Sequence, residues 1–403
     1  MKYFLKSLIV LLYTVLVKLM RIFTKPSQVF LICPPFPNNI NIGDRGLVLG
    51  ALCELYKYED DVVLVQMTDS YVQEFPEFPN LIITDKHTKL FKVNRDLASS
   101  LTWLFDLKTA KRVHLIGADS IDDYYSRSDA AAKMYAAELA GRLGIKTNVM
   151  SFSINEVSDA LKQRVSELTP NVHLVARDPV SFERLQKANI ERIHCSADLS
   201  YLFEPSAIRD DANLHEFLNA NAGNILGFSF NNLLFSANEN NDARFDFYAQ
   251  AIYELAIKAE KKVLFIPNND RDAKKYGEAI HQRIVEKAPS LSYFSEYLGD
   301  PSELKALMSK CYYYFSTTLH MGLFPIGVGV PTTCFPYAGK FDGPLQLLDS
   351  IECQIKPDDI PSSPTDFARM MYEHLSAADF RKKNIEANLP KVKTLAKINL
   401  QDF

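Results

Sequence analysis

The chain has 403 residues, of which 47% are hydrophobic and 23% charged, and its formal net charge is −4. This length exceeds that of a usual single domain and predicts two domains, each with a core of its own. Acidic and basic residues are interspersed, so the sequence lacks the basic excess or stripe typical of nucleic-acid binding, and we expect no nucleic-acid partner.

The six cysteines are dispersed along the chain and form no C-x-x-C pair. Most of them lie in apolar runs, which favours buried free thiols and a reducing, cytoplasmic compartment. Because no Cys/His spacing of the zinc type occurs either, the sequence predicts no metal site.

Residues 1–25 differ in composition from the rest of the chain. The apolar run Ser7–Val17 is about 11 residues long, short of the roughly 20 that a spanning helix needs. It lacks a small-residue cleavage site, which disfavours a signal peptide. Basic residues flank it on both sides: Lys2, Lys6, Lys18, Arg21 and Lys25. We favour a helix in the interface of an anionic membrane, with a spanning anchor and a helix packed on the protein as alternatives.

After Pro26, short apolar runs alternate with amphipathic stretches, which is typical of a parallel sheet covered by helices. The strands expected in the first domain are Val29–Cys33, Val62–Gln66, Leu81–Ile83, Val113–Ile116, Asn148–Phe152 and His173–Ala176. The helices expected between them include Arg45–Tyr58, Ala130–Leu143 and Val180–Ala188. Together these elements predict a Rossmann-like domain over residues 26–205.

The polar segment Glu204–Gly223 is the best candidate for the boundary between the two domains, because the pattern restarts after it. The strands expected there are Ile225–Phe230, Val263–Ile266, Leu291–Phe294, Tyr312–Ser316 and Thr332–Phe335. The helices expected there are Phe245–Glu260, Asp272–Lys287 and Ser302–Ser309. A second Rossmann-like domain is therefore predicted over 222–360, followed by a helical tail over 361–403. The predicted fold class is α/β, with two Rossmann-like domains and a cleft between them.

The tetrapeptide Asn41–Asp44 follows the first expected strand and a proline-rich turn. A glycine at a strand-to-helix turn lets backbone N–H groups approach an anion, and a helix N-terminus favours negative charge. Gly43 and Asp44 are therefore candidates for anion binding. The alternative is a simple turn in which Asp44 caps a helix that begins at Arg45.

A glycine-led acidic turn, Gly117–Tyr125, follows the expected strand Val113–Ile116. Open α/β sheets bind ligands at the carboxyl ends of their strands, so carboxylates and tyrosines in this turn are suited to hold sugar hydroxyls. The candidates are Asp119, Asp122, Asp123 and Tyr124. The alternative is a solvated turn that caps the next helix; no spacing specific to a divalent metal supports ligation by the three aspartates.

Arg177 follows another expected strand and precedes a strong helix start, with Asp178 as the N-cap and Pro179 at the first helical position. A guanidinium at the edge of the sheet is suited to clamp a phosphate or carboxylate through two hydrogen bonds. The alternative is a structural Arg–Asp ion pair.

The segment 316–340 carries the richest set of polar residues. Ser316–Gly322 reads Ser-Thr-Thr-Leu-His-Met-Gly, so His320 is expected at a strand end beside a helix N-terminus. A histidine in that position is a candidate ligand or acid–base group. Tyr337 and Lys340 follow the next expected strand. The alternative for His320 is that it caps the helix or fills a polar gap.

Together these motifs resemble those of the polysaccharide pyruvyl transferase family. The resemblance covers about residues 38–345 and rests on five segments in order: Asn41–Asp44, Gly117–Tyr125, Arg177–Ser181, Ala197–Leu199 and Ser316–Lys340. It implies a two-domain fold of the glycosyltransferase B type. It also implies transfer of a pyruvyl group from phosphoenolpyruvate to two sugar hydroxyls, which forms a cyclic ketal in cell-surface polysaccharide biosynthesis.

The resemblance implies roles for the candidate residues. Those expected to act in catalysis are His320, Asp122 and Asp123. The donor is expected to contact Arg177, Lys340, Gly43, Asp44 and Thr318, and the acceptor Asp119, Tyr124 and Tyr337. Phosphoenolpyruvate is a co-substrate, so no cofactor is expected. The expected acceptor is a sugar or lipid-linked oligosaccharide at the inner face of a membrane, which residues 1–25 would contact.

Two positions depart from the family pattern. Thr318 stands where the family has an arginine, and Asn268 where a histidine often follows a proline. Loss of a guanidinium weakens a phosphate site unless another cation, such as Arg271, replaces it. Two alternatives therefore remain: a glycosyltransferase that uses a nucleotide sugar, and a non-catalytic family member that binds a glycan or a partner enzyme.

Overall fold

The computed structural model describes residues 2–34, 42–67, 75–92, 96–124, 126–231, 241–267, 272–296, 299–336 and 339–403. The chain forms two compact units. The first unit consists of Met1–Asn38, Leu47–Leu202 and Lys393–Phe403, and the second of Asn39–Gly46 and Phe203–Val392. The predicted helical tail is thus divided between the units, and the segment that carries Gly43 belongs to the second unit.

The first unit has a seven-stranded parallel sheet in the order β3-β2-β1-β4-β5-β6-β7. Its strands are β1 Gln28–Ile32, β2 Val62–Val65, β3 Ile82–Thr84, β4 Ala110–Ala118, β5 Lys146–Phe152, β6 Val172–Ala176 and β7 Ile193–Cys195. The central strands are buried almost throughout, as expected of a parallel sheet with cover on both faces. All strands therefore end at the same edge of this sheet.

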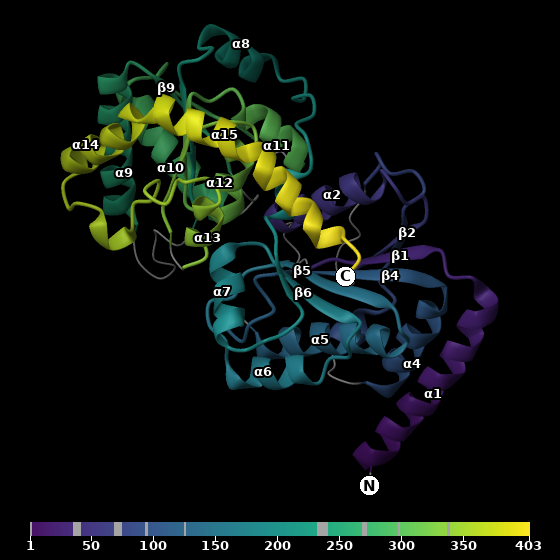
Figure 1. Cartoon of the computed structure of the whole chain (residues 1–403). Helices are drawn as coiled ribbons and strands as arrows, with labels where there is room; N and C mark the ends of the chain where they lie inside the picture. Colours follow the sequence, from purple (N-terminus) through teal and green to yellow (C-terminus); the bar gives the residue numbers. More distant parts are fainter. Residues whose placement is uncertain are drawn as a thin grey trace. The chain divides into compact units, whose positions relative to one another are not determined.

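The helices of the first unit are α1 Lys2–Thr24, α3 Thr88–Lys92, α4 Leu97–Asp106, α5 Arg127–Arg142, α6 Asp159–Ser166 and α7 Pro179–Lys187. Helix α2 Ile42–Leu55 is shared: its first turn, up to Gly46, belongs to the second unit and the rest to the first. Helices α4, α5 and α6 lie along one side of the sheet (Figure 1). Helix α7 begins as predicted, because Asp178 accepts a hydrogen bond from the Ser181 backbone N–H and Pro179 follows the cap.

The second unit has a five-stranded parallel sheet in the order β10-β9-β8-β11-β12. Its strands are β8 Ile225–Ser229, β9 Lys262–Phe265, β10 Ser292–Phe294, β11 Tyr313–Ser316 and β12 Thr332–Cys334. Its helices are α8 Ala212–Ala220, α9 Asp242–Ala259, α10 Asp272–Lys287, α11 Pro301–Met308, α12 Leu319–Ile326, α13 Asp342–Gln346, α14 Pro364–Ser376 and α15 Ala378–Ala396. Aromatic side chains of β8, β9 and β11 form much of its core.

The segment predicted as the domain boundary contains a helix that the sequence did not indicate. The boundary segment Glu204–Gly223 contains helix α8, whose leucines Leu214 and Leu218 are buried. Asp211 caps this helix through the Leu214 N–H, so the polar residues of the segment start a helix.

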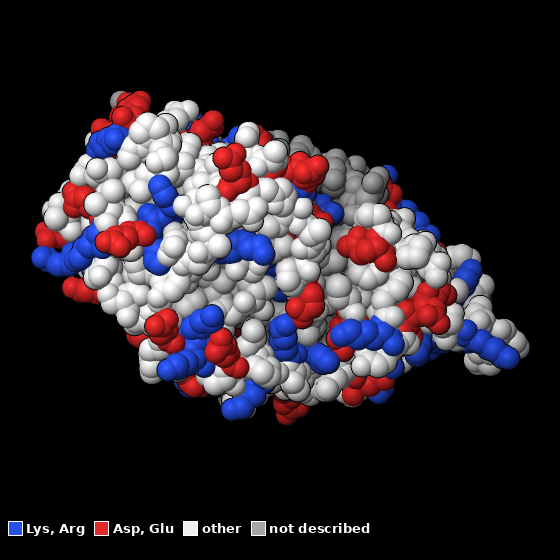
Figure 2. Space-filling model, turned by 90° about the horizontal axis from the view of Figure 1, so that it is seen from above, with Lys and Arg blue, Asp and Glu red and all other residues white. Residues whose placement is uncertain are grey.

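On the face seen in Figure 2, basic and acidic side chains are interspersed, as in the sequence.

Candidate functional site

The acidic turn lies at the carboxyl end of β4, in the first unit. Two residues near this edge of the sheet, Ala118 and Ser151, have a φ of 50°, which side-chain-bearing residues rarely adopt. The Ser153 N–H donates to the Ala118 carbonyl at 3.2 Å and helps to fix the two strand ends together. Such conformations persist where surrounding contacts enforce them, and they cluster at functional sites.

Arg177 is fully buried and links the carboxyl ends of strands β4 to β7. Its guanidinium donates to Ser153 Oγ at 2.8 Å, to Asp198 Oδ2 at 3.2 Å and to Asp119 Oδ1 at 2.5 Å. Burial by itself lowers the pKa of Arg177, but Asp119, Asp198 and Asp178 together raise it above its ordinary value.

This geometry disfavours the predicted contact between Arg177 and an anionic donor. The side chain has no exposed surface, and its hydrogen-bond donors already face carboxylates and a hydroxyl. The arrangement is that of a structural Arg–Asp ion pair, the alternative that the sequence leaves open. Arg177 therefore positions Asp119, whose side chain is 34% exposed, at the edge of the sheet.

Asp122 and Asp123, the predicted catalytic carboxylates, have different surroundings. Asp122 is 1% exposed and accepts hydrogen bonds from the backbone and side-chain nitrogens of Asn155 at 2.8 and 3.0 Å. Burial raises the pKa of Asp122, and these hydrogen bonds limit the rise. Burial also acts to raise the pKa of Asp123, but hydrogen bonds from Ser158 and Arg164 bring it below its ordinary value. Asp122 is thus the carboxyl group more easily protonated.

Lys133 of α5 belongs to this cluster but was not predicted. It is fully buried and donates to the Gly117 carbonyl at 3.1 Å and to Ser120 Oγ, so it supports the acidic turn from inside. The available signal was a lysine within the otherwise apolar run Ala130–Met134.

Tyr124 is 65% exposed at the end of the described part of the turn. Among the described residues, no group of three or more His, Cys, Asp or Glu side chains is arranged to hold a metal ion.

Two motifs that are far apart in the sequence meet in the second unit. Helix α2 begins at Ile42, so Gly43 and Asp44 lie in its first turn, which corrects the predicted start at Arg45 with Asp44 as its cap. A Cβ on Gly43 would lie 2.6 Å from Cγ of His320 and would overlap Nδ1. Glycine is therefore required for the imidazole ring to pack where it does.

The same contact continues one turn further along both helices. A Cβ on Gly46 would lie 2.7 Å from Cζ of Phe324, which is one turn after His320 on α12. On the other side of α12, a Cβ on Gly322 would lie 2.9 Å from Sγ of Cys334 in β12. Small residues thus allow α12 to lie close to both the first turn of α2 and the sheet.

A turn held by Ser316 connects β11 to α12. Ser316 Oγ accepts from the Thr318 N–H at 3.2 Å and donates to the Thr318 carbonyl at 2.8 Å. Thr318 is the N-cap residue, but its hydroxyl makes no cap hydrogen bond and has no hydrogen-bond partner among the described residues. Thr318 and the half-buried His320 therefore lie at the carboxyl end of β11, the edge at which such sheets bind ligands.

The remaining predicted residues are placed as follows. Lys340, just after β12, is buried in the same unit as His320, and Asp44 is half-buried in the first turn of α2. Tyr337, Asn268 and Arg271 lie outside the described residues. The predicted site residues thus form two groups, with the acidic turn and Arg177 in the first unit and the glycine–histidine contact in the second.

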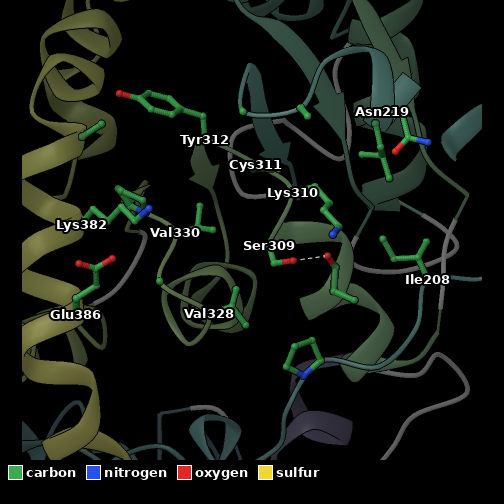
Figure 3. A pocket seen from close by; sticks show the side chains of 18 of the residues that line it. Ile208, Asn219, Ser309, Lys310, Cys311, Tyr312, Val328, Val330, Lys382 and Glu386 are labelled. Carbon is green, nitrogen blue, oxygen red and sulfur yellow. Dashed lines mark hydrogen bonds between the residues drawn. The ribbon is translucent and has the colours of Figure 1, made fainter. Parts of the chain in front are cut away.

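A cavity of about 1150 Å³ in the second unit lies away from all of these residues. Gly223, Tyr312 and Pro331, which line it, directly precede strands of the sheet or lie within two residues of them, so it opens at the amino-terminal edge. Figure 3 shows Lys382 and Glu386 entering it from α15. Ligands of parallel α/β sheets bind at the opposite edge, so this cavity is not part of the predicted site.

The fold is similar to that of several solved structures. A putative UDP-N-acetylglucosamine 2-epimerase from Listeria monocytogenes superimposes with a TM-score of 0.59 at 12% identity, over 93% of this chain and 95% of that one. UGT2 of Phytolacca americana, complexed with UDP-2fluoro-glucose and pterostilbene, gives 0.57 at 12% identity, over 92% and 95%. At this identity the likeness shows the fold alone. It confirms the predicted fold class, two Rossmann-like units of the glycosyltransferase B type.

No curated protein matches this chain in sequence. The profile of the polysaccharide pyruvyl transferase family matches residues 41–339. The match begins at Asn41, the first residue of the first motif, and ends directly before Lys340. Because it spans well over half of the sequence and includes the motifs in their order, the chain belongs to the polysaccharide pyruvyl transferase family.

Proposed function

We propose that this family member transfers the pyruvyl group of phosphoenolpyruvate to two hydroxyls of a sugar and so forms a cyclic ketal in cell-surface polysaccharide biosynthesis. Family membership supports a transferase that acts on polysaccharide. The observation that carries the finer proposal is the packing of Gly43 against His320. It unites the first and last motifs of the family in one place, at the carboxyl edge of a sheet.

The reaction consists of an addition and a displacement. One sugar hydroxyl adds to C2 of phosphoenolpyruvate while a proton is delivered to the methylene carbon. The second hydroxyl then displaces inorganic phosphate from the same carbon and closes the ketal ring. The enzyme needs a base for the hydroxyl protons, an acid for the methylene carbon, and cationic or N–H groups for the donor's phosphate and carboxylate.

In the proposed arrangement, the donor binds at the second unit. His320 and Lys340 supply imidazole and ammonium groups, Gly43 leaves room for the His320 ring, and Asp44 and Thr318 are proposed to contact the donor. With a threonine in place of the family's arginine, the site relies more strongly on Lys340 to neutralise the phosphate.

The acceptor binds at the acidic turn of the first unit, according to the same proposal. Asp119 and Tyr124 have exposed surface with which to bind sugar hydroxyls. Asp122, whose pKa is raised by burial, is suited to donate a proton, and the ion-paired Asp123 holds the turn against α6. No cofactor is required in this scheme.

We further propose a lipid-linked acceptor at the cytoplasmic face of a membrane. The support is α1, in which Phe4–Thr24 is long and apolar enough to cross a bilayer, with a mean hydropathy of 1.9. Residues 1–25 contain five basic residues and no acidic ones, a composition that favours anionic lipid.

Titration calorimetry with phosphoenolpyruvate and with UDP tests the donor, and phosphate release in the presence of sugar acceptors tests the reaction. We expect binding of phosphoenolpyruvate, acceptor-dependent phosphate release, and loss of that release in His320→Asn with an unchanged melting temperature. Thr318→Arg is expected to increase affinity for phosphoenolpyruvate. Binding of UDP alone would favour a nucleotide-sugar glycosyltransferase, and binding of neither would favour a non-catalytic family member.

A further inference from the structure

Helix α1 has one face that is docked on the first unit. Val10, Thr14, Val17 and Arg21 follow one another at helical spacing, and Val10 and Val17 are buried in the core of this unit. Arg21 donates to the carbonyls of Leu107 and, at 2.7 Å, Ala110, while Thr24 donates to the carbonyl of Lys108 at 3.0 Å. The helix is therefore part of the folded domain along most of its length.

The opposite face of α1 is apolar and exposed. It carries ten large apolar side chains, each at least 40% exposed: Phe4, Leu5, Leu8, Leu11, Leu12, Val15, Leu16, Leu19, Ile22 and Phe23. The polar groups Thr14 and Arg21 lie on the docked face instead. This is the reverse of a surface helix in a soluble protein, which turns its apolar face toward the core. An apolar exposed surface of this extent indicates a partner.

The neighbouring helix α4 also carries an exposed aromatic side chain. Phe105 of α4 is 37% exposed, and Lys108 lies with its ammonium 3.5 Å from the centre of the Phe105 ring. Arg21 and Thr24 bond to the carbonyls of residues 107 and 108, so this aromatic–basic pair lies beside the carboxyl end of α1. Aromatic and basic side chains together are typical of proteins at the membrane interface.

We propose that α1 lies in the plane of an anionic membrane, with its outer face in one leaflet and its docked face on the first unit. A spanning orientation would require α1 to leave the domain, which would expose Val10 and Val17 and break the bonds of Arg21 to two carbonyls. An in-plane orientation keeps these contacts and covers the exposed face with acyl chains. The inference rests on the membrane partner proposed above and is independent of the donor and the reaction.

The charges around the helix distinguish lipid from a second copy of the chain. Lys6, Lys18 and Lys25 are exposed, and residues 1–25 contain no acidic side chain. Two copies that met through this face would bring like charges together, whereas anionic headgroups would neutralise them. The occupant that fits the surface is therefore the headgroup and upper acyl region of an anionic leaflet.

Tryptophan scanning in brominated vesicles tests the orientation. Leu5→Trp, Leu12→Trp and Leu19→Trp place one fluorescent probe per heptad on the outer face. The fluorescence of the wild type, which comes from the buried Trp103, is subtracted as a constant background. In phosphatidylcholine–phosphatidylglycerol vesicles with bromine at a shallow or a deep acyl position, an in-plane helix gives equal depth at all three probes, nearer the shallow bromines. Tyr58→Trp, at an exposed site of the same unit, should not be quenched.

A spanning helix gives a different pattern, because seven residues of α-helix rise about 10 Å. Leu12→Trp would then be quenched from the deep position and Leu5→Trp from the shallow one, which would overturn the proposal. Absence of quenching together with a dimer in solution would also overturn it, in favour of a second copy.

A second variant separates this inference from the proposed reaction. Leu12→Glu alters only the exposed face and is expected to lower vesicle binding at least tenfold, with unchanged melting temperature and unchanged affinity for phosphoenolpyruvate. Deletion of residues 1–25 is a poorer test, because it removes Val10 and Val17 from the core. Vesicle binding by Leu12→Glu at the wild-type level would contradict the in-plane contact.

Discussion

The carboxyl edges of the two sheets hold their polar side chains by different means. In the first unit, buried ions neutralise one another, with Arg177 between Asp119 and Asp198. In the second unit, a serine hydroxyl fixes a turn, and Gly43 leaves room for the His320 ring. The first edge therefore depends on charge balance and the second on shape. We expect substitutions at the first edge to affect stability most, and those at the second to affect function as well.

The largest expected effect is that of Arg177→Ala. It would leave Asp119, Asp178 and Asp198 without their shared cation, and loss of one partner from a buried ion pair costs about 3–5 kcal/mol. We expect a large drop in the midpoint of thermal unfolding. Arg369→Ala, which removes an exposed arginine paired with Asp366, is the matched control and should cost less than about 1 kcal/mol. An Arg177→Ala protein that melts like the wild type but no longer binds phosphoenolpyruvate would support the predicted contact between Arg177 and the donor.

Acid should weaken the first unit through His114. This side chain is buried on β4, and burial, with a contribution from Arg112, lowers its pKa to about 4. The unfolded chain has the ordinary histidine pKa of 6.5, so it binds the proton more readily than the folded chain. The contribution of His114 to the free energy of unfolding is therefore fully present above pH 6.5 and is lost as the pH falls toward 4. The loss for this one group is about 3 kcal/mol.

Urea unfolding between pH 7 and pH 4.5 measures this loss. The substitution His114→Leu should make the free energy of unfolding depend less steeply on pH. Neither ring nitrogen of His114 has a hydrogen-bond partner among the described residues, so the leucine leaves no bond broken. In the second unit, burial, aided by Arg381, also lowers the pKa of His374 to about 4, but this side chain is less completely buried. Its contribution should be smaller. Equal pH slopes for wild type and His114→Leu would contradict the assignment.

Gly43→Ala tests whether shape controls the second edge. The added methyl group would overlap the His320 ring, and overpacking of this kind costs about 1–3 kcal/mol. We expect a moderate loss of stability and loss of acceptor-dependent phosphate release. The double variant Gly43→Ala/His320→Gly should recover stability but not turnover. Gly277→Ala is the control, since its Cβ would meet only one ring carbon of Phe294, at 3.2 Å.

The sequence predicted some strands, helices and site residues correctly and left others out. The strands were predicted where the sequence has an apolar run, as at β4 and β5, but β7 was missed because Ile193 stands between Arg192 and His194 and forms no such run. Helix α8 was not predicted, because the polar residues on both sides of it resemble a loop. The motifs identified Gly43 and His320 separately. Their contact depends on how α2 packs against α12, which no local pattern encodes.

The buried ions of the first unit show a similar limit. Arg177 and Asp198 were visible as motif residues, and a structural ion pair was one of the alternatives for Arg177. The choice between that pair and donor binding required the burial of the guanidinium, which depends on four strand ends together. Lys133 was overlooked because a lysine on a helix is usually solvated, whereas this one is enclosed beneath the acidic turn.

The smallest expected effect comes from one capping residue in each unit. Asp300 caps α11 through the Ser302 N–H at 2.8 Å, and Asp178 caps α7 through the Ser181 N–H at 2.7 Å. Asp300→Ala should cost about 1 kcal/mol, the usual value for a cap, and Asp300→Asn should recover most of it. Asp178→Ala should cost more, because Asp178 also accepts from Ser153 Oγ and lies within the buried charge cluster around Arg177. Chemical denaturation of the three variants measures the difference. Equal losses of unfolding free energy in Asp178→Ala and Asp300→Ala would mean that the charge cluster around Arg177 adds no stability beyond the helix cap. That result would contradict the role of charge balance at the first edge.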